Sequence, residues 1–254
     1  MQQRMAGRVA LITGAGQGVG QGIALALATE GVSIAVVGRT AAKLEETCRL
    51  VRERGVEAEA FEIDVADTAS LPGLVEAVVE RFGRLDILVN NAYAGAYGTL
   101  LDLSDRAFQK GFLTGPFAAF SLMKAAHPHL KATGDGSIVN LVTSAMVRWD
   151  PTTYGAYAAA KQALRSLSRT AAAEWAVDGI RVNSIAPHAL SPGLKGWTEA
   201  NPEEAEEFVA AIPMRRIGDC EDDIGRAVVA LVSPDLRYLT GATIPLDGGQ
   251  AFFG

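Results

Sequence analysis

Three polar side chains between positions 144 and 161 have types and spacing suited to proton transfer. They are Ser144, Tyr157 thirteen positions later and Lys161 four positions after that. A tyrosine and a lysine four apart on a helix share one face, and a neighbouring ammonium favours ionisation of a phenol. Ser144, after the apolar run SIVNLV, could hydrogen-bond a substrate oxygen. The set predicts a site that polarises a carbon–oxygen group, although the tyrosine–lysine spacing alone also fits a half-buried pair without chemistry.

A second pattern lies at the amino terminus, in GRVALITGAGQGVGQGIALALATEG. It predicts a strand from about Arg8 to Thr13, a glycine-rich turn and a helix that stops at Gly31. A second apolar strand at 33–38 completes the strand–helix–strand unit in which such a turn binds a pyrophosphate. The predicted cofactor contacts of the turn are Gly14, Gln17, Gly18, Val19 and Gly20.

The residues after the second strand bear on the choice between NAD and NADP. An NAD site usually has a carboxylate there, whereas an arginine suits the extra phosphate of NADP. This chain has Gly38, Arg39 and Thr40. NADP(H) is therefore favoured over NAD(H), although Gln17 offers no second cation and Arg39 could be a solvated surface residue.

With these motifs in a chain of 254 residues, the sequence resembles the short-chain dehydrogenase/reductase family over essentially its whole length. The resemblance implies that Ser144 holds the substrate oxygen, Tyr157 is the acid or base, and Lys161 lowers the pKa of Tyr157 and binds the nicotinamide ribose. It also implies further cofactor contacts from Asp64, Val65, Asn90, Asn91, Ala92, Pro187 and the backbone near Leu190.

Three positions depart from the family pattern. Tyr93 stands where the family usually has glycine, and Phe112 replaces an asparagine that supports a water relay to the lysine. Phenylalanine cannot donate or accept a hydrogen bond, so the relay could be rerouted or turnover slow. His188 also replaces a glycine, and it could be an extra proton carrier or an ordinary residue of a substrate loop.

Aromatic side chains near these motifs predict an apolar substrate pocket. The predicted pocket residues are Tyr93, Phe112, Ser144, Trp149, Tyr154, His188 and Trp197, with Phe252 or Phe253 as further candidates. The expected reaction is hydride transfer between nicotinamide and a cyclic, aromatic or steroid-like alcohol or ketone. One alternative is carrier-linked 3-ketoacyl reduction, with Arg148, Arg215 and Arg216 as the basic patch. The other is a dinucleotide-binding protein with little turnover.

Alternating strands and helices predict one domain over residues 1–254, an α/β fold with a doubly wound (Rossmann) seven-stranded parallel sheet. The irregular segment at about 187–213 is expected to be a substrate lid. The resemblance implies a homo-oligomer, a tetramer or dimer that pairs the long helix bearing Tyr157.

Bulk properties exclude several classes of partner. The net charge is −6 without a basic block, so neither nucleic acid nor an anionic membrane is expected. Two distant cysteines suggest neither a metal site nor a disulfide framework, which favours a reducing cytoplasm. A signal peptide and a membrane-spanning run are not expected from this sequence.

Overall fold

The computed structural model describes residues 4–148, 153–251 and 253. In this part of the chain, seven parallel strands form one sheet in the order β3-β2-β1-β4-β5-β6-β7. The strands are β1 (Val9–Thr13), β2 (Ser33–Gly38), β3 (Ala58–Glu62), β4 (Ile87–Asn90), β5 (Gly136–Leu141), β6 (Ile180–Pro187) and β7 (Thr243–Leu246). The predicted doubly wound parallel sheet is confirmed.

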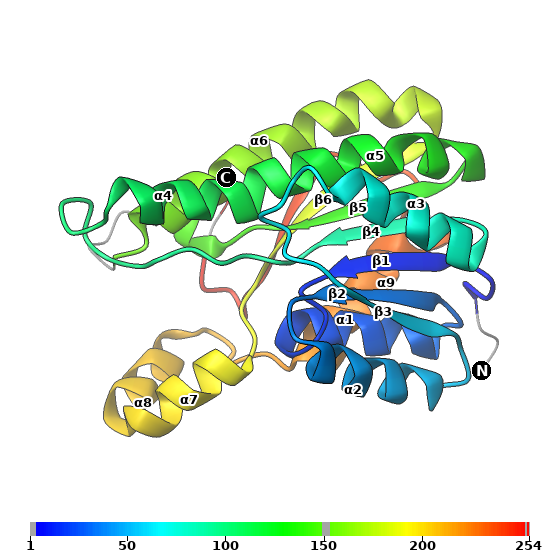
Figure 1. Cartoon of the computed structure of the whole chain (residues 1–254). Helices are drawn as coiled ribbons and strands as arrows, with labels where there is room; N and C mark the ends of the chain where they lie inside the picture. Colours follow the sequence, from blue (N-terminus) through cyan, green and yellow to red (C-terminus); the bar gives the residue numbers. More distant parts are fainter. Residues whose placement is uncertain (1–3, 149–152, 252, 254) are drawn as a thin grey trace.

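Helices cover both faces of the sheet (Figure 1). One face carries α1 (Gly18–Thr29), α2 (Ala41–Arg52) and α9 (Arg226–Val232). The other carries α3 (Leu71–Phe82), α5 (Ala118–Thr133) and α6 (Gly155–Trp175). Along β1, Ala10 and Ile12 join the core under α1, and Val9 and Leu11 join the core on the opposite face. Such two-sided burial explains why the strands are almost continuous apolar runs.

The segment from 104 to 133 is divided rather than one buried helix. Ser104 caps α4 (Asp105–Phe112), since its hydroxyl accepts the Ala107 N–H at 3.2 Å. A π-helical turn, η1 (Leu113–Phe117), follows and contains Pro116, which interrupts the regular helical hydrogen bonding. Within α4 only Gly111 is buried.

The expected lid segment forms two short helices, α7 (Pro192–Ala200) and α8 (Pro202–Ala211). They stand away from the sheet, beyond the ends of the strands, at the same end of the molecule as α4 (Figure 1). The remaining short elements are η2 (Ser144–Val147), η3 (Ala176–Asp178), η4 (Cys220–Gly225) and η5 (Pro234–Leu236).

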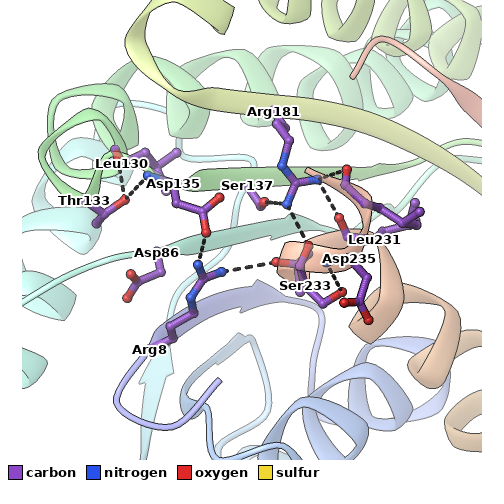
Figure 2. Close-up of polar contacts among 12 residues, drawn as sticks. Arg8, Asp86, Leu130, Thr133, Asp135, Ser137, Arg181, Leu231, Ser233 and Asp235 are labelled. Atoms are coloured by element: carbon purple, nitrogen blue, oxygen red, sulfur yellow. Dashed lines mark hydrogen bonds and ion pairs between the residues drawn. The ribbon is translucent and has the colours of Figure 1, made fainter. Parts of the chain in front are cut away.

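Two arginines, Arg8 and Arg181, make hydrogen bonds and ion pairs at the amino ends of the strands. Arg181 at the start of β6 is 8% exposed, and its guanidinium donates to the Leu231 carbonyl at 2.7 Å and to Ser137 Oγ at 2.8 Å. Figure 2 shows Arg8 nearby, paired with Asp135. These contacts tie β5, β6 and the end of α9 together. They lie at the edge of the sheet away from the carboxyl ends of the strands, so their role is structural.

Candidate active site

A cleft of about 540 Å³ opens at the carboxyl ends of the central strands. In this strand order β1 lies between β2 and β4, and the chain reverses direction across the sheet there. Ligands of open α/β sheets bind at such a switch point. The cleft is lined by the glycine turn, the ends of β2 and β3 with the segments that follow them, and the loop after β4, together with residues from η1, α6 and the start of α7.

Asn91 locks the floor of this cleft. Its Nδ2 donates to the carbonyl oxygens of Thr13 at 2.8 Å and Gly14 at 3.1 Å. A Cβ on Gly14 would lie 2.7 Å from that nitrogen, and one on Gly20 would lie 2.5 Å from it. Both positions therefore exclude larger residues. Asn91, predicted as a cofactor contact, lines the cleft and also fixes the glycine turn against the end of β4.

The first turn of α1 is suited to a phosphate group. Gln17 is its N-cap and makes no side-chain capping bond, and no acidic residue lies in that turn. The amides of Gly18, Val19 and Gly20 are therefore not capped by the Gln17 side chain, and all three residues line the cleft. Uncapped amides and the helix dipole favour an anion. The glycine turn thus fits the pyrophosphate of a dinucleotide.

Two cations lie at the far end of the cleft. Arg39 lines it and is 3.8 Å from the carboxylate of Asp64, while Val65 lines the cleft beside them. Lys43, from the first turn of α2, also lines it and donates to Gln17 Oε1 at 2.6 Å. Sequence reasoning missed Lys43 because it looked for a second cation only within the glycine turn.

Tyr157 and Lys161 are brought together on the first turns of α6. Lys161 is 2% exposed, and its Nζ donates to the Leu141 carbonyl at the end of β5 at 2.6 Å. The same Nζ lies 5.8 Å from the centroid of the Tyr157 ring. Burial lowers the pKa of Lys161 to about 7.

The pKa of Tyr157 moves in the direction opposite to the expected one. Burial raises it, the neighbouring Tyr97 adds to the rise, and a hydrogen bond with Thr143 lowers it. Lys161 Nζ faces the Tyr157 ring at 5.8 Å from its centroid. With its pKa raised, the phenol is a neutral proton donor near neutral pH.

The hydroxyl beside Tyr157 belongs to Thr143 rather than Ser144. Thr143 is half-buried and hydrogen-bonds the phenol, as its effect on the pKa of Tyr157 shows. Ser144 is buried, and its Oγ donates to Asp247 Oδ2 at 2.6 Å. In this structure the Thr143 hydroxyl is therefore the one bonded to the phenol, and the role expected of Ser144 at the substrate oxygen stays a prediction.

Asp247 was not anticipated from the sequence. It is 3% exposed and accepts the backbone N–H groups of Gly249, Gln250 and Ala251 at 3.1–3.2 Å, besides the Ser144 hydroxyl. A buried carboxylate with this many donors is well satisfied. The Ser144–Asp247 pair therefore ties the turn after β5 to the carboxyl-terminal segment.

A buried amide pair holds α6 against the sheet. Asn90 Nδ2 donates to Asn140 Oδ1 at 2.7 Å, and Asn140 Nδ2 donates to Ser168 Oγ on α6 at 2.8 Å. Asn90, expected near the cofactor, does not line the main cleft and serves this structural contact. The chain of bonds links β4, β5 and α6, and so fixes the helix that carries Tyr157 and Lys161.

Tyrosines form one wall of the cleft. The Tyr157 ring lies 4.9 Å from that of Tyr93, 5.7 Å from that of Tyr97 and 6.3 Å from that of Tyr154. Of the predicted pocket residues, Tyr93 and Tyr154 lie next to Tyr157, and Tyr93 also lines the cleft. The Phe112 ring contacts Phe108 and Phe117 instead and does not line the cleft. Trp149 and Phe252 lie outside the described residues.

The lid side holds the other predicted aromatic residues. His188 and Trp197 both contact Phe208 of α8, with ring centroids 5.1 and 5.8 Å apart. His188 lines a separate cavity of about 300 Å³, and burial lowers the pKa of its imidazole. This surrounding favours an ordinary loop residue over an extra proton carrier.

The expected nicotinamide contacts are also placed differently. Pro187 ends β6 outside the main cleft, and the Leu190 N–H is occupied by the Gly218 carbonyl at 2.8 Å. Ser191, Pro192 and Gly193 line the cleft in their place. A Cβ on Gly18 would lie 3.2–3.3 Å from Pro192 and Ser191, so the start of α7 lies directly against the glycine turn.

The described part of the chain shows neither a metal-ligand cluster nor a membrane-spanning helix. Its residues contain no group of three or more metal-ligating side chains. None of their helices is long and apolar enough to cross a membrane.

Comparison with known proteins agrees with this geometry. A family model described as enoyl-(acyl carrier protein) reductase matches residues 14–251. A 12α-hydroxysteroid dehydrogenase from Clostridium sp. is 38% identical over 252 residues, covering 96% of both chains. A 2,5-dichloro-2,5-cyclohexadiene-1,4-diol dehydrogenase from Sphingobium indicum is 34% identical over 250 residues, covering 98% of both.

The fold also matches solved structures. The structure of an NAD⁺-bound xylitol dehydrogenase superposes with a TM-score of 0.90 at 33% identity, covering 97% of this chain and 100% of the other. With the family model and the relatives, this match shows that the chain belongs to the short-chain dehydrogenase/reductase family and is an oxidoreductase of alcohols and ketones.

Proposed function

We propose that this enzyme interconverts an apolar cyclic ketone and its secondary alcohol and prefers NADP(H) to NAD(H). The observation that carries the proposal is the position of Tyr157. It lies in the same cleft as the glycine turn and the two cations, next to a buried lysine and a wall of tyrosine rings. When bound, the nicotinamide supplies or accepts the hydride.

The protein's part is to bind, orient and move one proton. The neutral Tyr157 phenol donates its proton to the substrate oxygen during reduction and takes it back during oxidation. The Thr143 hydroxyl, hydrogen-bonded to the same phenol, is placed to stabilise the negative charge that develops on that oxygen. In its ammonium form Lys161 supplies a positive charge near the phenol, and the Leu141 carbonyl holds it there.

The preference for NADP rests on charge at the far end of the cleft. Arg39 and Lys43 both line it; Arg39 lies 3.8 Å from the Asp64 carboxylate, and Lys43 is bonded to the neutral Gln17. Two cations at this end favour a phosphate over a ribose hydroxyl pair. The xylitol dehydrogenase relative binds NAD⁺ in the same fold, so these side chains and not the fold carry the proposal.

The substrate class rests on the tyrosine wall. Tyr93, Tyr97 and Tyr154 surround Tyr157 with ring faces and edges, a surface that suits a flat apolar ring system. Two of the relatives are named for a hydroxysteroid and a cyclohexadiene diol. Carrier-linked reduction is less favoured, because Arg216 of the suggested basic patch is held by Asp223 at 2.5 and 2.7 Å.

A homo-oligomer is the proposed assembly, and the structure suggests a face for it. Phe108, Leu113, Phe117 and Phe120 on α4, η1 and α5 are each 38–54% exposed. Contiguous exposed apolar side chains of this kind usually mark an interface. Light scattering on Phe117→Glu and on wild type would show the smaller species in the variant only, if this face forms the assembly.

Titration of the purified protein with NADPH and NADH, followed by nicotinamide fluorescence, tests the cofactor proposal. We expect a lower Kd for NADPH, and oxidation of the bound NADPH when a cyclic ketone is added. A lower Kd for NADH would contradict the argument from Arg39 and Lys43. Binding of NADPH without turnover across steroid, monocyclic and aromatic ketones would contradict the substrate class.

A further inference from the structure

Tyr93, in the loop after β4, contacts both members of the catalytic pair. Its ring centroid lies 4.9 Å from that of Tyr157 and 5.0 Å from Lys161 Nζ. The ammonium is closer to this ring than to Tyr157, whose centroid is 5.8 Å away. With the Leu141 carbonyl at 2.6 Å, the buried charge lies between one oxygen and two ring faces.

Glycines make room for the Tyr93 ring. A Cβ on Gly95 would lie 2.2 Å from the Tyr93 hydroxyl, and a Cβ on Gly111 of α4 would lie 2.7 Å from it. Real Cβ atoms do not approach so closely, so any larger residue at either position would displace the ring. A Cβ on Gly115 would touch the ring edge at 3.5 Å, an ordinary contact. The side chain is therefore seated against α4 and η1 on one side and the catalytic pair on the other.

The described groups near Lys161 Nζ include no carboxylate, so the Tyr93 ring is an important partner for the positive charge. The titratable groups around it are Tyr93 from the loop and Tyr157 from its own helix, with Tyr97 against Tyr157. Burial raises the pKa of Tyr93 to about 12 and also raises the pKa of Tyr157, so both phenols are neutral near neutral pH. A neutral aromatic face attracts a cation through its quadrupole, most strongly where water is excluded.

We propose that Tyr93 is a positioning residue: the face of its ring holds the Lys161 ammonium beside Tyr157, and Gly95 and Gly111 fix the ring in that place. The consequence for turnover rests on the proposed function. The contact between ring and ammonium does not, and it can be measured separately.

The first test is the titration of Lys161 by NMR in protein labelled with ¹³C at the lysine ε-carbon. The chain has six lysines, and Lys161→Met identifies the Lys161 signal. Tyr93→Leu removes the ring and should lower the pKa of Lys161 by about 0.5 to 1 unit, because the protonated form loses a cation–π contact. Tyr93→Phe keeps the ring and should shift that pKa far less.

The second test uses the fit of the ring. Gly111→Ala should lower the pKa of Lys161 by displacing Tyr93, and the double variant Tyr93→Phe/Gly111→Ala should restore it, because phenylalanine lacks the clashing hydroxyl. Gly98→Ala is the matched control, since its Cβ would meet Leu103 at an ordinary 3.5 Å. Melting temperatures identify any variant that loses its fold.

An unchanged pKa of Lys161 in folded Tyr93→Leu would overturn the proposal. A shift in Tyr93→Phe as large as in Tyr93→Leu would also overturn it, since the hydroxyl and not the ring would then matter. With a cyclic ketone, kcat/KM should be about tenfold lower in Tyr93→Leu than in Tyr93→Phe. A wild type that turns over no ketone but shows the predicted NMR shifts would contradict the proposed function alone.

Discussion

Removal of the Thr143 hydroxyl should damage catalysis, whereas removal of the Ser144 hydroxyl should mainly cost stability. Thr143→Val keeps the shape of the side chain and removes the group that hydrogen-bonds the Tyr157 phenol. A hydrogen bond to a group that carries charge in the reaction is worth about 1.5–3 kcal/mol. Since each ~1.4 kcal/mol is tenfold in rate, kcat should fall by about 10- to 150-fold.

Ser144→Ala should behave differently because of Asp247. That carboxylate accepts the Ser144 hydroxyl at 2.6 Å and keeps three backbone donors when the hydroxyl is removed. The free energy of unfolding should therefore fall by about 1–2 kcal/mol, and kcat by less than about threefold.

The assay is steady-state oxidation of NADPH at saturating ketone, with thermal unfolding measured on the same preparations. Thr143→Ser is the control, because Thr143 Oγ1 also accepts the Ala145 N–H at 3.2 Å and a serine keeps both contacts. A Ser144→Ala variant that loses as much kcat as Thr143→Val, or a Thr143→Val variant with full kcat, would refute the reasoning.

Three further outcomes are expected. Lys43→Ala should raise the Kd for NADPH about tenfold, as expected for loss of one phosphate contact, and leave the Kd for NADH nearly unchanged in fluorescence titrations. Gly22→Ala should lower the melting temperature by several degrees, because its Cβ would lie 2.2 Å from the Cys220 carbonyl oxygen; Gly73→Ala, which would meet nothing within 4 Å, should not. Lys161→Met should stabilise the fold most at low pH. Burial lowers the pKa of Lys161 in the folded protein to about 7 from the ordinary 10.5. The free-energy cost of burying the charge is therefore complete below pH 7 and disappears as pH rises toward 10.5. Denaturant unfolding of both proteins across that range checks the last outcome, and a pH-independent difference would contradict it.

Features that depend on local pattern could be predicted from the sequence. The apolar strands, the glycine turn and the Tyr157–Lys161 pair each lie within one element or one turn, where periodicity sets which side chains share a face. The doubly wound parallel sheet followed from the alternation of strands and helices. A dinucleotide site after the first strand followed from the glycine turn between the first strand and its helix.

Features that depend on how distant segments pack against each other could not be predicted from the sequence. Spacing counted from Tyr157 selects Ser144, but it does not show which hydroxyl after β5 contacts the phenol: Thr143 bonds the phenol, and Ser144 bonds Asp247. Lys43 reaches Gln17 from 26 positions away, through the packing of α2 beside the glycine turn.

The position of Phe112 shows the same limit for a helix. A π-helical turn begins directly after it, and its ring lies with Phe108 and Phe117 rather than in the cleft. Gly111, Gly115 and Pro116 indicate a distortion in this stretch, but not the direction in which the Phe112 ring points.

The most direct test of the central claim is NADPH oxidation by wild type and by Tyr157→Phe, with a panel of cyclic ketones. Both proteins should bind NADPH with similar Kd, and the wild type should reduce at least one ketone. Loss of the proton donor should lower kcat in Tyr157→Phe by about 10²- to 10⁴-fold. An active wild type whose kcat survives this substitution would contradict the assignment of Tyr157 as the group that transfers the proton.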